Sequence, residues 1–287
     1  MESTVYQPPP SLPELPEGVD PMPRWPAWYA FAGFGAFIIA TLIAQSILSL
    51  ATGSDLADPD PAIVVISTLI MECIAFATAW AFTSLTAPPK LWHFGLRAAR
   101  FWPAVGWAAL GMAAFWTFSA VYSVAVQPDI EQNVTESLGA DQSTLGLIAA
   151  GLVIIGVAPL AEEFFFRGFM YRSLRGRFPI VVAAVIDGLI FGVIHYQPCE
   201  TGAASCNAAD GLLLVPPLAL LGLIFCLVYE KTGSLFPAIA MHAFNNALAF
   251  AVQADGWPVS VVVGPLVIAA CVFVPARLGA SRRTRMA

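Results

Sequence analysis

Long apolar runs of membrane-spanning length alternate with short polar segments along most of the chain. Eight runs are predicted, at residues 27–52, 62–86, 103–126, 144–166, 179–198, 211–230, 234–254 and 257–276. A helix needs about 20 mostly apolar residues to cross the hydrocarbon core of a bilayer. The runs are continuous and lack a period of two, so helices are the spanning element they favour. The pattern predicts an all-α, polytopic transmembrane bundle of about eight helices.

The composition agrees with a membrane protein. Of the 287 residues, 58% are hydrophobic and 11% are charged, with a mean hydropathy of +0.75. Soluble domains carry about 25% charged residues, so an ordinary soluble protein is excluded. The basic residues lie in short connections and form no stripe, which argues against a nucleic-acid partner. The expected partner is the lipid bilayer, and the expected location is the cell membrane as a multi-pass protein.

All 13 basic residues fall in alternate connections. The connection after the fourth run is assigned four of them, Arg167, Arg172, Arg175 and Arg177, and the intervening connections carry only acids. Because Lys and Arg favour the cytoplasmic side, this distribution predicts that both termini are cytoplasmic. On this topology Cys199 and Cys206 lie outside the cell, where a disulfide and two free thiols both remain open.

Four regions follow from these assignments. Residues 1–26 contain eight prolines and no basic n-region, and they predict a disordered cytoplasmic tail and not a signal peptide. Residues 27–143 hold transmembrane helices one to three. Residues 144–276 hold helices four to eight, which are expected to form the functional core. Residues 277–287 form a predicted basic cytoplasmic tail.

Two adjacent carboxylates, Glu162 and Glu163, lie near the end of the fourth run. An ionisable group at membrane depth costs about 2.5–3.5 kcal/mol on insertion scales, so packing alone does not explain the pair. On a helix, Glu163 and Arg167 lie on one face in the order that favours an ion pair. Glu162 points about 100° away around the helix. We therefore expect Arg167 to hold Glu163 and leave Glu162 available for chemistry.

Later apolar runs contain further polar groups at a spacing of four. Phe191 and His195 share one helix face, and His242 and Asn246 share another. With Glu162, these residues supply a base, two imidazoles and an amide, which are the parts of a hydrolytic site. Glu162 takes a proton from a water that His195 shares or orients. His242 and Asn246 donate to the oxyanion that forms at a carbonyl.

These residues resemble three motifs of the type II CAAX prenyl endopeptidase family, also called the CAAX protease and bacteriocin-processing family. The motifs are Glu162-Glu163-x-x-x-Arg167, Phe191-x-x-x-His195 and His242-x-x-x-Asn246. The resemblance covers about residues 144–254. It implies an intramembrane endopeptidase that acts on a peptide or protein substrate, membrane-associated ones included. It also implies catalytic roles for Glu162, His195, His242 and Asn246, and supporting roles for Glu163, Arg167 and Phe191.

No cofactor is expected, although the resemblance leaves zinc open. Members of this family have been described both as metalloproteases and as metal-free glutamate proteases. If a metal is present, its ligands are expected to be Glu162, His195 and His242, since two histidines and a carboxylate suit zinc. These three residues lie on separate helices, without the His-Glu-x-x-His motif.

The predicted depths of the site residues conflict. Glu162 lies near the cytoplasmic end of its run, whereas His195 follows Pro179 by 16 residues, or about 24 Å along a helix. An offset or tilted fifth helix is needed to bring the two together.

Two other functions compete with proteolysis. A proton-coupled transporter would use buried acids and histidines as a relay, including Glu72 and Asp187, which taken alone are interpreted as structural or pore-facing. A membrane scaffold would keep the fold and regulate partners without cleavage.

Overall fold

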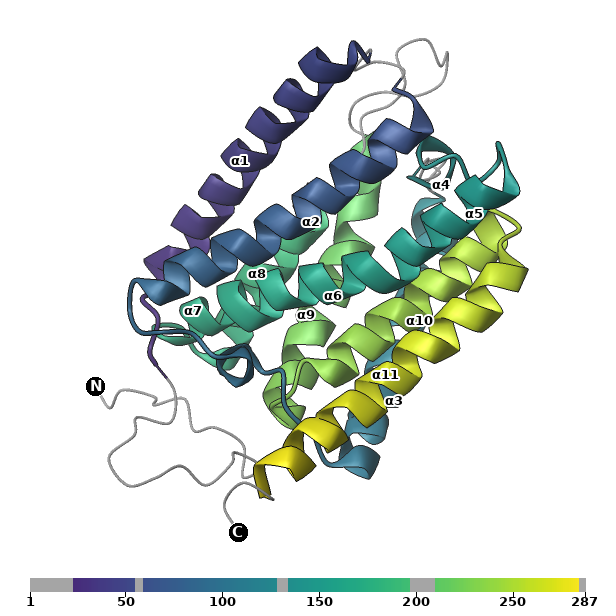
Figure 1. The fold of residues 1–287 in the computed structure, drawn as a ribbon. Helices are drawn as coiled ribbons and strands as arrows, with labels where there is room; N and C mark the ends of the chain where they lie inside the picture. Colours follow the sequence, from purple (N-terminus) through teal and green to yellow (C-terminus); the bar gives the residue numbers. More distant parts are fainter. Residues whose placement is uncertain (1–22, 55–58, 128–133, 197–209, 284–287) are drawn as a thin grey trace.

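The computed structural model describes residues 23–54, 59–127, 134–196 and 210–283, and every regular element in this part of the chain is a helix (Figure 1). The all-α prediction is confirmed. The elements are α1 (Trp28–Thr52), α2 (Pro61–Ser84), η1 (Leu91–Phe94), α3 (Phe101–Val126), α4 (Val134–Ser137), α5 (Thr144–Gly151), η2 (Leu152–Val157), α6 (Ala158–Glu163), η3 (Phe164–Tyr171), α7 (Arg172–Arg175), α8 (Ile180–Ile194), η4 (Asp210–Leu214), α9 (Val215–Thr232), α10 (Phe236–Gln253) and α11 (Trp257–Arg283).

Several helices have the dimensions of membrane spans. In the described ranges, six are long and apolar enough to cross a bilayer: Trp28–Thr52, Pro61–Ser84, Phe101–Val126, Thr144–Arg175, Gly211–Thr232 and Trp257–Pro275. α8 is apolar but has only 15 residues, and α10 carries His242 and two asparagines. The number of long apolar helices therefore indicates a multi-pass membrane protein. Eight crossings and cytoplasmic termini stay predictions.

The fourth helix is longer than predicted. The segments from α5 to α7 form one rod from Thr144 to Arg175, so the predicted end at residue 166 is wrong (Figure 1). Arg167, Arg172 and Arg175 lie inside this rod and are buried. Each has a compensating partner: Arg167 pairs with Glu163, Arg175 pairs with Glu230, and Arg172 lies over the ring of Trp25. Paired arginines are compatible with a buried helix, which the count of charges alone did not reveal.

The connections at one end of the bundle pack on one another. The Leu235 N–H donates to the Gly95 carbonyl at 2.9 Å, and the ring of Trp25 lies 5.1 Å from that of Phe94. Trp25 falls in the predicted disordered tail, yet its side chain is buried. At the other terminus, α11 continues to Arg283, within the predicted basic tail. Residues 1–22 and 284–287 and the Cys199–Cys206 pair lie outside the described residues.

Helices α8 and α9 approach each other through glycines. A Cβ on Gly192 would lie 2.7 Å from the Val215 carbonyl oxygen, and one on Gly188 would lie 2.6 Å from that of Ala219. Real Cβ atoms do not approach backbone this closely, so only glycine permits the contact. This close packing fixes the position of α8 and of His195 at its end.

Gly192→Ala is expected to destabilise the fold by about 1–3 kcal/mol, because the added methyl overpacks the α8–α9 contact. The free energy of unfolding in detergent micelles measures this loss. Gly35→Ala on α1 is the matched control, since a Cβ there meets nothing within 4 Å. Equal stability of the two variants would contradict the close contact.

Candidate active site

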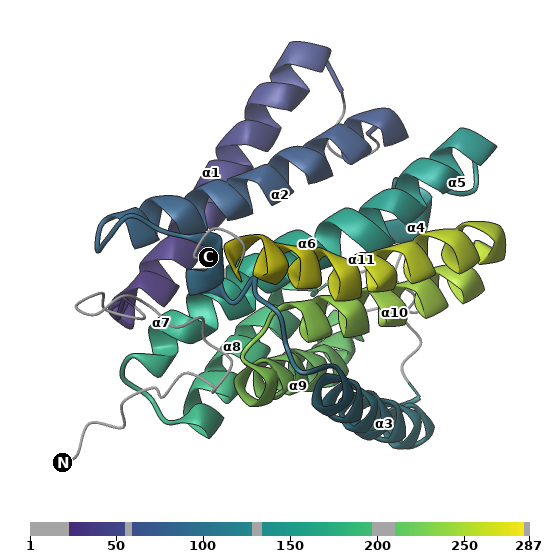
Figure 2. The same cartoon turned by 60° about the horizontal axis from the view of Figure 1, so that its bottom comes forward.

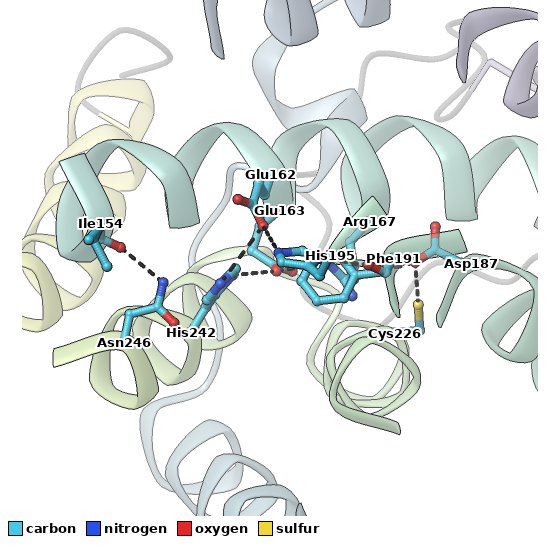
Figure 3. Close-up of polar contacts among 10 residues, drawn as sticks. All are labelled: Ile154, Glu162, Glu163, Arg167, Asp187, Phe191, His195, Cys226, His242 and Asn246. Atoms are coloured by element: carbon cyan, nitrogen blue, oxygen red, sulfur yellow. Dashed lines mark hydrogen bonds and ion pairs between the residues drawn. The ribbon is translucent and has the colours of Figure 1, made fainter. Parts of the chain in front are cut away.

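The predicted site residues come together from three helices (Figure 3). Glu162 lies on α6, His195 ends α8, and His242 and Asn246 lie on α10. The expected conflict in depth disappears because the fourth helix continues to Arg175. Glu162 precedes that end by 13 residues, or about 20 Å, and His195 follows the start of α8 by 15, or about 22 Å. The two arms of this hairpin therefore place both side chains at similar depth.

Glu162 faces both histidines across a short gap. Its Oε2 atom lies 3.9 Å from the Nε2 atom of His195 and 3.9 Å from the Nε2 atom of His242. These distances exceed a direct hydrogen bond. The Oε2 atom is itself buried and has no hydrogen-bond partner among the described residues, although the side chain is 19% exposed. Polar atoms at this separation suit a bridging water.

Contacts on the far side of each ring orient the two imidazoles. The Nδ1 atom of His195 lies 2.7 Å from the Phe191 carbonyl oxygen, and the Nδ1 atom of His242 lies 3.0 Å from Oε1 of Glu163. A carbonyl oxygen and an ionised carboxylate only accept hydrogen bonds, so both Nδ1 atoms carry hydrogen. In the neutral rings, both Nε2 lone pairs therefore point toward Glu162.

Asn246 is held by a carbonyl that the helix itself leaves unpaired. Its Nδ2 atom donates to the Ile154 carbonyl at 2.9 Å. Ile154 lies in the π-helix η2, where the Ala158 N–H bonds to the Val153 carbonyl, five residues back. The next donor in this pattern would be residue 159, which is proline and has no N–H. Pro159 thus leaves an acceptor for Asn246, a role that the sequence reasoning missed.

Glu163 and Arg167 form the ion pair that the sequence predicted. The Arg167 Nη1 atom donates to Glu163 Oε1 at 2.9 Å, and both side chains are fully buried. The Arg167 Nε atom also lies 3.5 Å from Oδ1 of Asp187, which accepts from the Cys226 thiol at 3.1 Å. Asp187 is therefore a structural ion partner. Asp187 meets Arg167 only because α8 folds back against the rod from Thr144 to Arg175. No spacing within a single helix could therefore indicate this pairing.

Aromatic rings enclose the buried guanidinium. The Arg167 Cζ atom lies 4.3 Å from the ring centroid of Phe191, 5.1 Å from that of Phe225 and 5.6 Å from that of Phe166. Such contacts stabilise a desolvated cation by about 2 kcal/mol. The Phe191 centroid also lies 4.6 Å from that of His195. The predicted supporting residue Phe191 thus contacts both the charged network and one imidazole.

A further carboxyl, Glu72, reaches the region from α2. It is buried, and its Oε1 atom has no hydrogen-bond partner among the described residues. One turn along the same helix, the ring of Phe76 lies 4.7 Å from that of Phe164, which places this face of α2 against the start of η3, directly after Glu163. The Glu72 carboxyl interacts electrostatically with Glu162.

The three candidate zinc ligands, Glu162, His195 and His242, lie farther apart than the ligands of a tetrahedral zinc site. Ligands in a tetrahedral zinc site lie about 3.3 Å from one another, given bonds of about 2.0–2.1 Å. The Glu162 oxygen lies 3.9 Å from each histidine nitrogen. No three His, Cys, Asp or Glu side chains within the described part of the chain are arranged to hold a metal ion. The residues as placed do not fit zinc.

The helices and this buried polar centre define a multi-pass α-helical membrane protein with glutamate, histidine and asparagine at its core. Residues 144–248 match the family described as type II CAAX prenyl endopeptidase, Rce1-like. The resemblance inferred from the three motifs is therefore confirmed.

Two similar proteins are described only as uncharacterized. YyaK of Bacillus subtilis (strain 168) is 32% identical over 103 residues, covering 35% of this chain and 32% of that protein. A 24.3 kDa protein of Escherichia coli is 29% identical over 140 residues, covering 48% of this chain and 59% of its own length. The matches thus span less than two thirds of either relative. No solved structure matches the chain.

Glu163→Gln is expected to lower the free energy of unfolding by about 3–5 kcal/mol, because it leaves part of the buried Arg167 charge uncompensated. Glu162→Gln changes the adjacent residue, which has no ion partner within hydrogen-bond distance, and is expected to lower it by less than about 1 kcal/mol. Unfolding in micelles measures both. Equal losses would refute the division of the two carboxylates into a paired one and a free one.

Proposed function

We propose that this protein is an intramembrane endopeptidase of the CAAX prenyl protease type, acting on a peptide or protein substrate. The observation that carries the proposal is the convergence of the Glu162 carboxylate and two oriented imidazoles at 3.9 Å. The family match over residues 144–248 supports the same reaction class. A positioned glutamate or histidine can act as the general base that takes a proton from water.

In the proposed reaction, a water occupies the gap between Glu162 and the Nε2 atom of His195. Glu162 takes one proton from this water, His195 accepts a hydrogen bond from it, and the oxygen attacks the peptide carbonyl carbon. The resulting oxyanion receives hydrogen bonds from the Asn246 amide and from protonated His242, whose positive charge Glu163 stabilises. Glu162 then gives its proton to the leaving amine as the carbon–nitrogen bond breaks.

We propose that this reaction needs no bound metal. The ligand spacing described above supports this view, since the site would have to contract to close around zinc. The residues provide the base, the water-orienting group and the oxyanion donors from the chain itself. Cleavage by the purified protein is therefore expected to be unchanged after treatment with a zinc chelator.

Glu162→Gln is expected to abolish proteolysis, with a loss of at least about 100-fold, because the variant removes the base and preserves the side-chain volume. The measurement compares new protein termini, by mass spectrometry, between native-host membranes that contain the wild type and those that contain the variant. Termini present only with the wild type identify the substrates and the cleavage position.

Equal abundance of the two proteins, measured in the same membranes, is the necessary control. His195→Ala is expected to remove the same termini as Glu162→Gln. If both variants produce every terminus that the wild type produces, the endopeptidase is refuted, and a scaffold or a proton-coupled transporter becomes the better explanation.

Asn246→Ala is expected to lower kcat by about 100–1000-fold, as the loss of an oxyanion donor does in other hydrolases. Pro159→Ala is expected to cost at least about tenfold, because residue 159 regains an N–H that competes for the Ile154 carbonyl. In the Asn246→Ala background, the same proline change is expected to cost less than about twofold. Additive losses would show that Pro159 acts on general stability and not through Asn246.

A further inference from the structure

One buried carboxyl, Glu72, has no part in the reaction proposed above. It lies near the middle of α2, a helix of 24 residues, and is only 4% exposed. Its Oε1 atom is buried and has no hydrogen-bond partner among the described residues. A carboxyl at membrane depth costs free energy, so a partner that compensates it is expected nearby.

The helices around α2 supply no cation for this carboxyl. α2 contains no basic residue, and it packs mainly on α1, α5, η2, α6 and η3. Of these, α1, α5 and η2 contain no charged residue at all. The one cation of η3, Arg167, pairs instead with Glu163 and Asp187. Within the described part of the chain, Glu72 is therefore not a member of a structural ion pair.

The packing of α2 along the rod places Glu72 level with Glu162. Figure 2 shows α2 beside α6, on the side away from α10. Toward one end of the contact, Val65 packs against the apolar cluster that contains Ile155 of η2. Toward the other end, the ring of Phe76 lies 4.7 Å from a ring at the start of η3. Glu72 lies between these two contacts on α2, as Glu162 does on the rod, and the two carboxyls interact electrostatically.

Two neighbouring carboxyls in an apolar bundle do not both ionise, because their charges repel and neither is solvated, so one of them keeps a proton. Glu72 is buried, whereas the Glu162 side chain is 19% exposed. Burial penalises the charged form of the more deeply buried group, so the proton belongs to Glu72. A protonated carboxyl is a hydrogen-bond donor, and the Oε2 atom of Glu162 is an acceptor without a partner among the described residues.

We propose that Glu72 is a neutral carboxylic acid whose O–H group stabilises the ionised carboxylate of Glu162, directly or through one water. This role rests on the proposed proteolysis, and it makes Glu72 a positioning residue. It keeps Glu162 ionised and therefore able to take a proton from the attacking water. The proton of Glu72 stays on Glu72 throughout, so the proton balance of the reaction is unchanged.

Infrared spectroscopy of the purified protein at neutral pH tests the proton on Glu72 and requires no activity. The wild type is expected to show the C=O stretch of a protonated carboxyl that Glu72→Gln lacks. In Glu162→Gln the same band is expected to remain but to move to higher frequency, because an amide is a weaker acceptor than a carboxylate. If Glu72→Gln removes a carboxylate band instead, or if the band does not move in Glu162→Gln, the proposal is overturned.

Cleavage of a substrate identified from the new termini tests the role of Glu72 in the reaction. Glu72→Leu is expected to lower kcat by at least about tenfold, because a hydrogen bond to a charged group is lost. Glu72→Gln is expected to restore kcat to within about threefold of the wild type, because its amide N–H donates to the same carboxylate. Cys73→Leu is the matched control at the next position, which is exposed, and it is expected to cleave as the wild type does.

The role of Glu72 and the proposed function fail in different ways. If Glu72→Leu cleaves as the wild type does while Glu162→Gln does not, the role of Glu72 is overturned and the endopeptidase stands. If Glu72→Gln is as slow as Glu72→Leu, Glu72 acts as an ionised group and the proposal is overturned. If the wild type cleaves nothing, the proposed function fails, and the infrared bands decide the contact between the two carboxyls. Should Glu72→Leu fail to fold, Glu72→Met replaces it, because an apolar side chain of similar volume is tolerated in an apolar interior.

Discussion

A fully buried guanidinium in an apolar helix bundle must be compensated, and Arg167 meets this requirement through Glu163 on its own rod and Asp187 on α8. A buried ion pair stabilises a fold only when its geometry and remaining hydrogen bonds are good. Here the rings of Phe191 and Phe225 add contacts on the face of the cation. The network therefore ties α6, η3, α8 and α9 together at the depth of the polar centre.

The rest of the polar centre depends on this network. The Oε1 atom of Glu163 accepts a hydrogen bond from Arg167 and also lies within hydrogen-bond distance of the Nδ1 atom of His242. The second contact turns the Nε2 atom of His242 toward Glu162. The Phe191 backbone carbonyl does the same for His195. Both imidazoles assigned to the proposed reaction are thus positioned by a neighbour that does not react. Such support would hold the proposed hydrolytic site in place in the absence of substrate.

The wrong end of the fourth helix shows where sequence reasoning fails in a membrane protein. Arginines at the end of an apolar run suggest a solvated connection, because an isolated charge in a bilayer is costly. Arg167 and Arg175 escape this cost through Asp187 and Glu230, which lie far along the chain. Placing these arginines in a connection also created the apparent mismatch in depth between Glu162 and His195, which the longer rod removes.

The sequence by itself determined the helical class, the three motifs, and the Glu163–Arg167 pair, because hydropathy and helical spacing are local properties of the chain. Only the tertiary structure decided what those residues meet. In the folded protein, Asp187 pairs with Arg167, and Gly192 allows α8 to pack closely against α9. The tertiary structure also supplied the carbonyl that Pro159 leaves open for Asn246. These contacts join segments that are distant in sequence, and their register is set by side-chain packing across helices, which no spacing within one helix records.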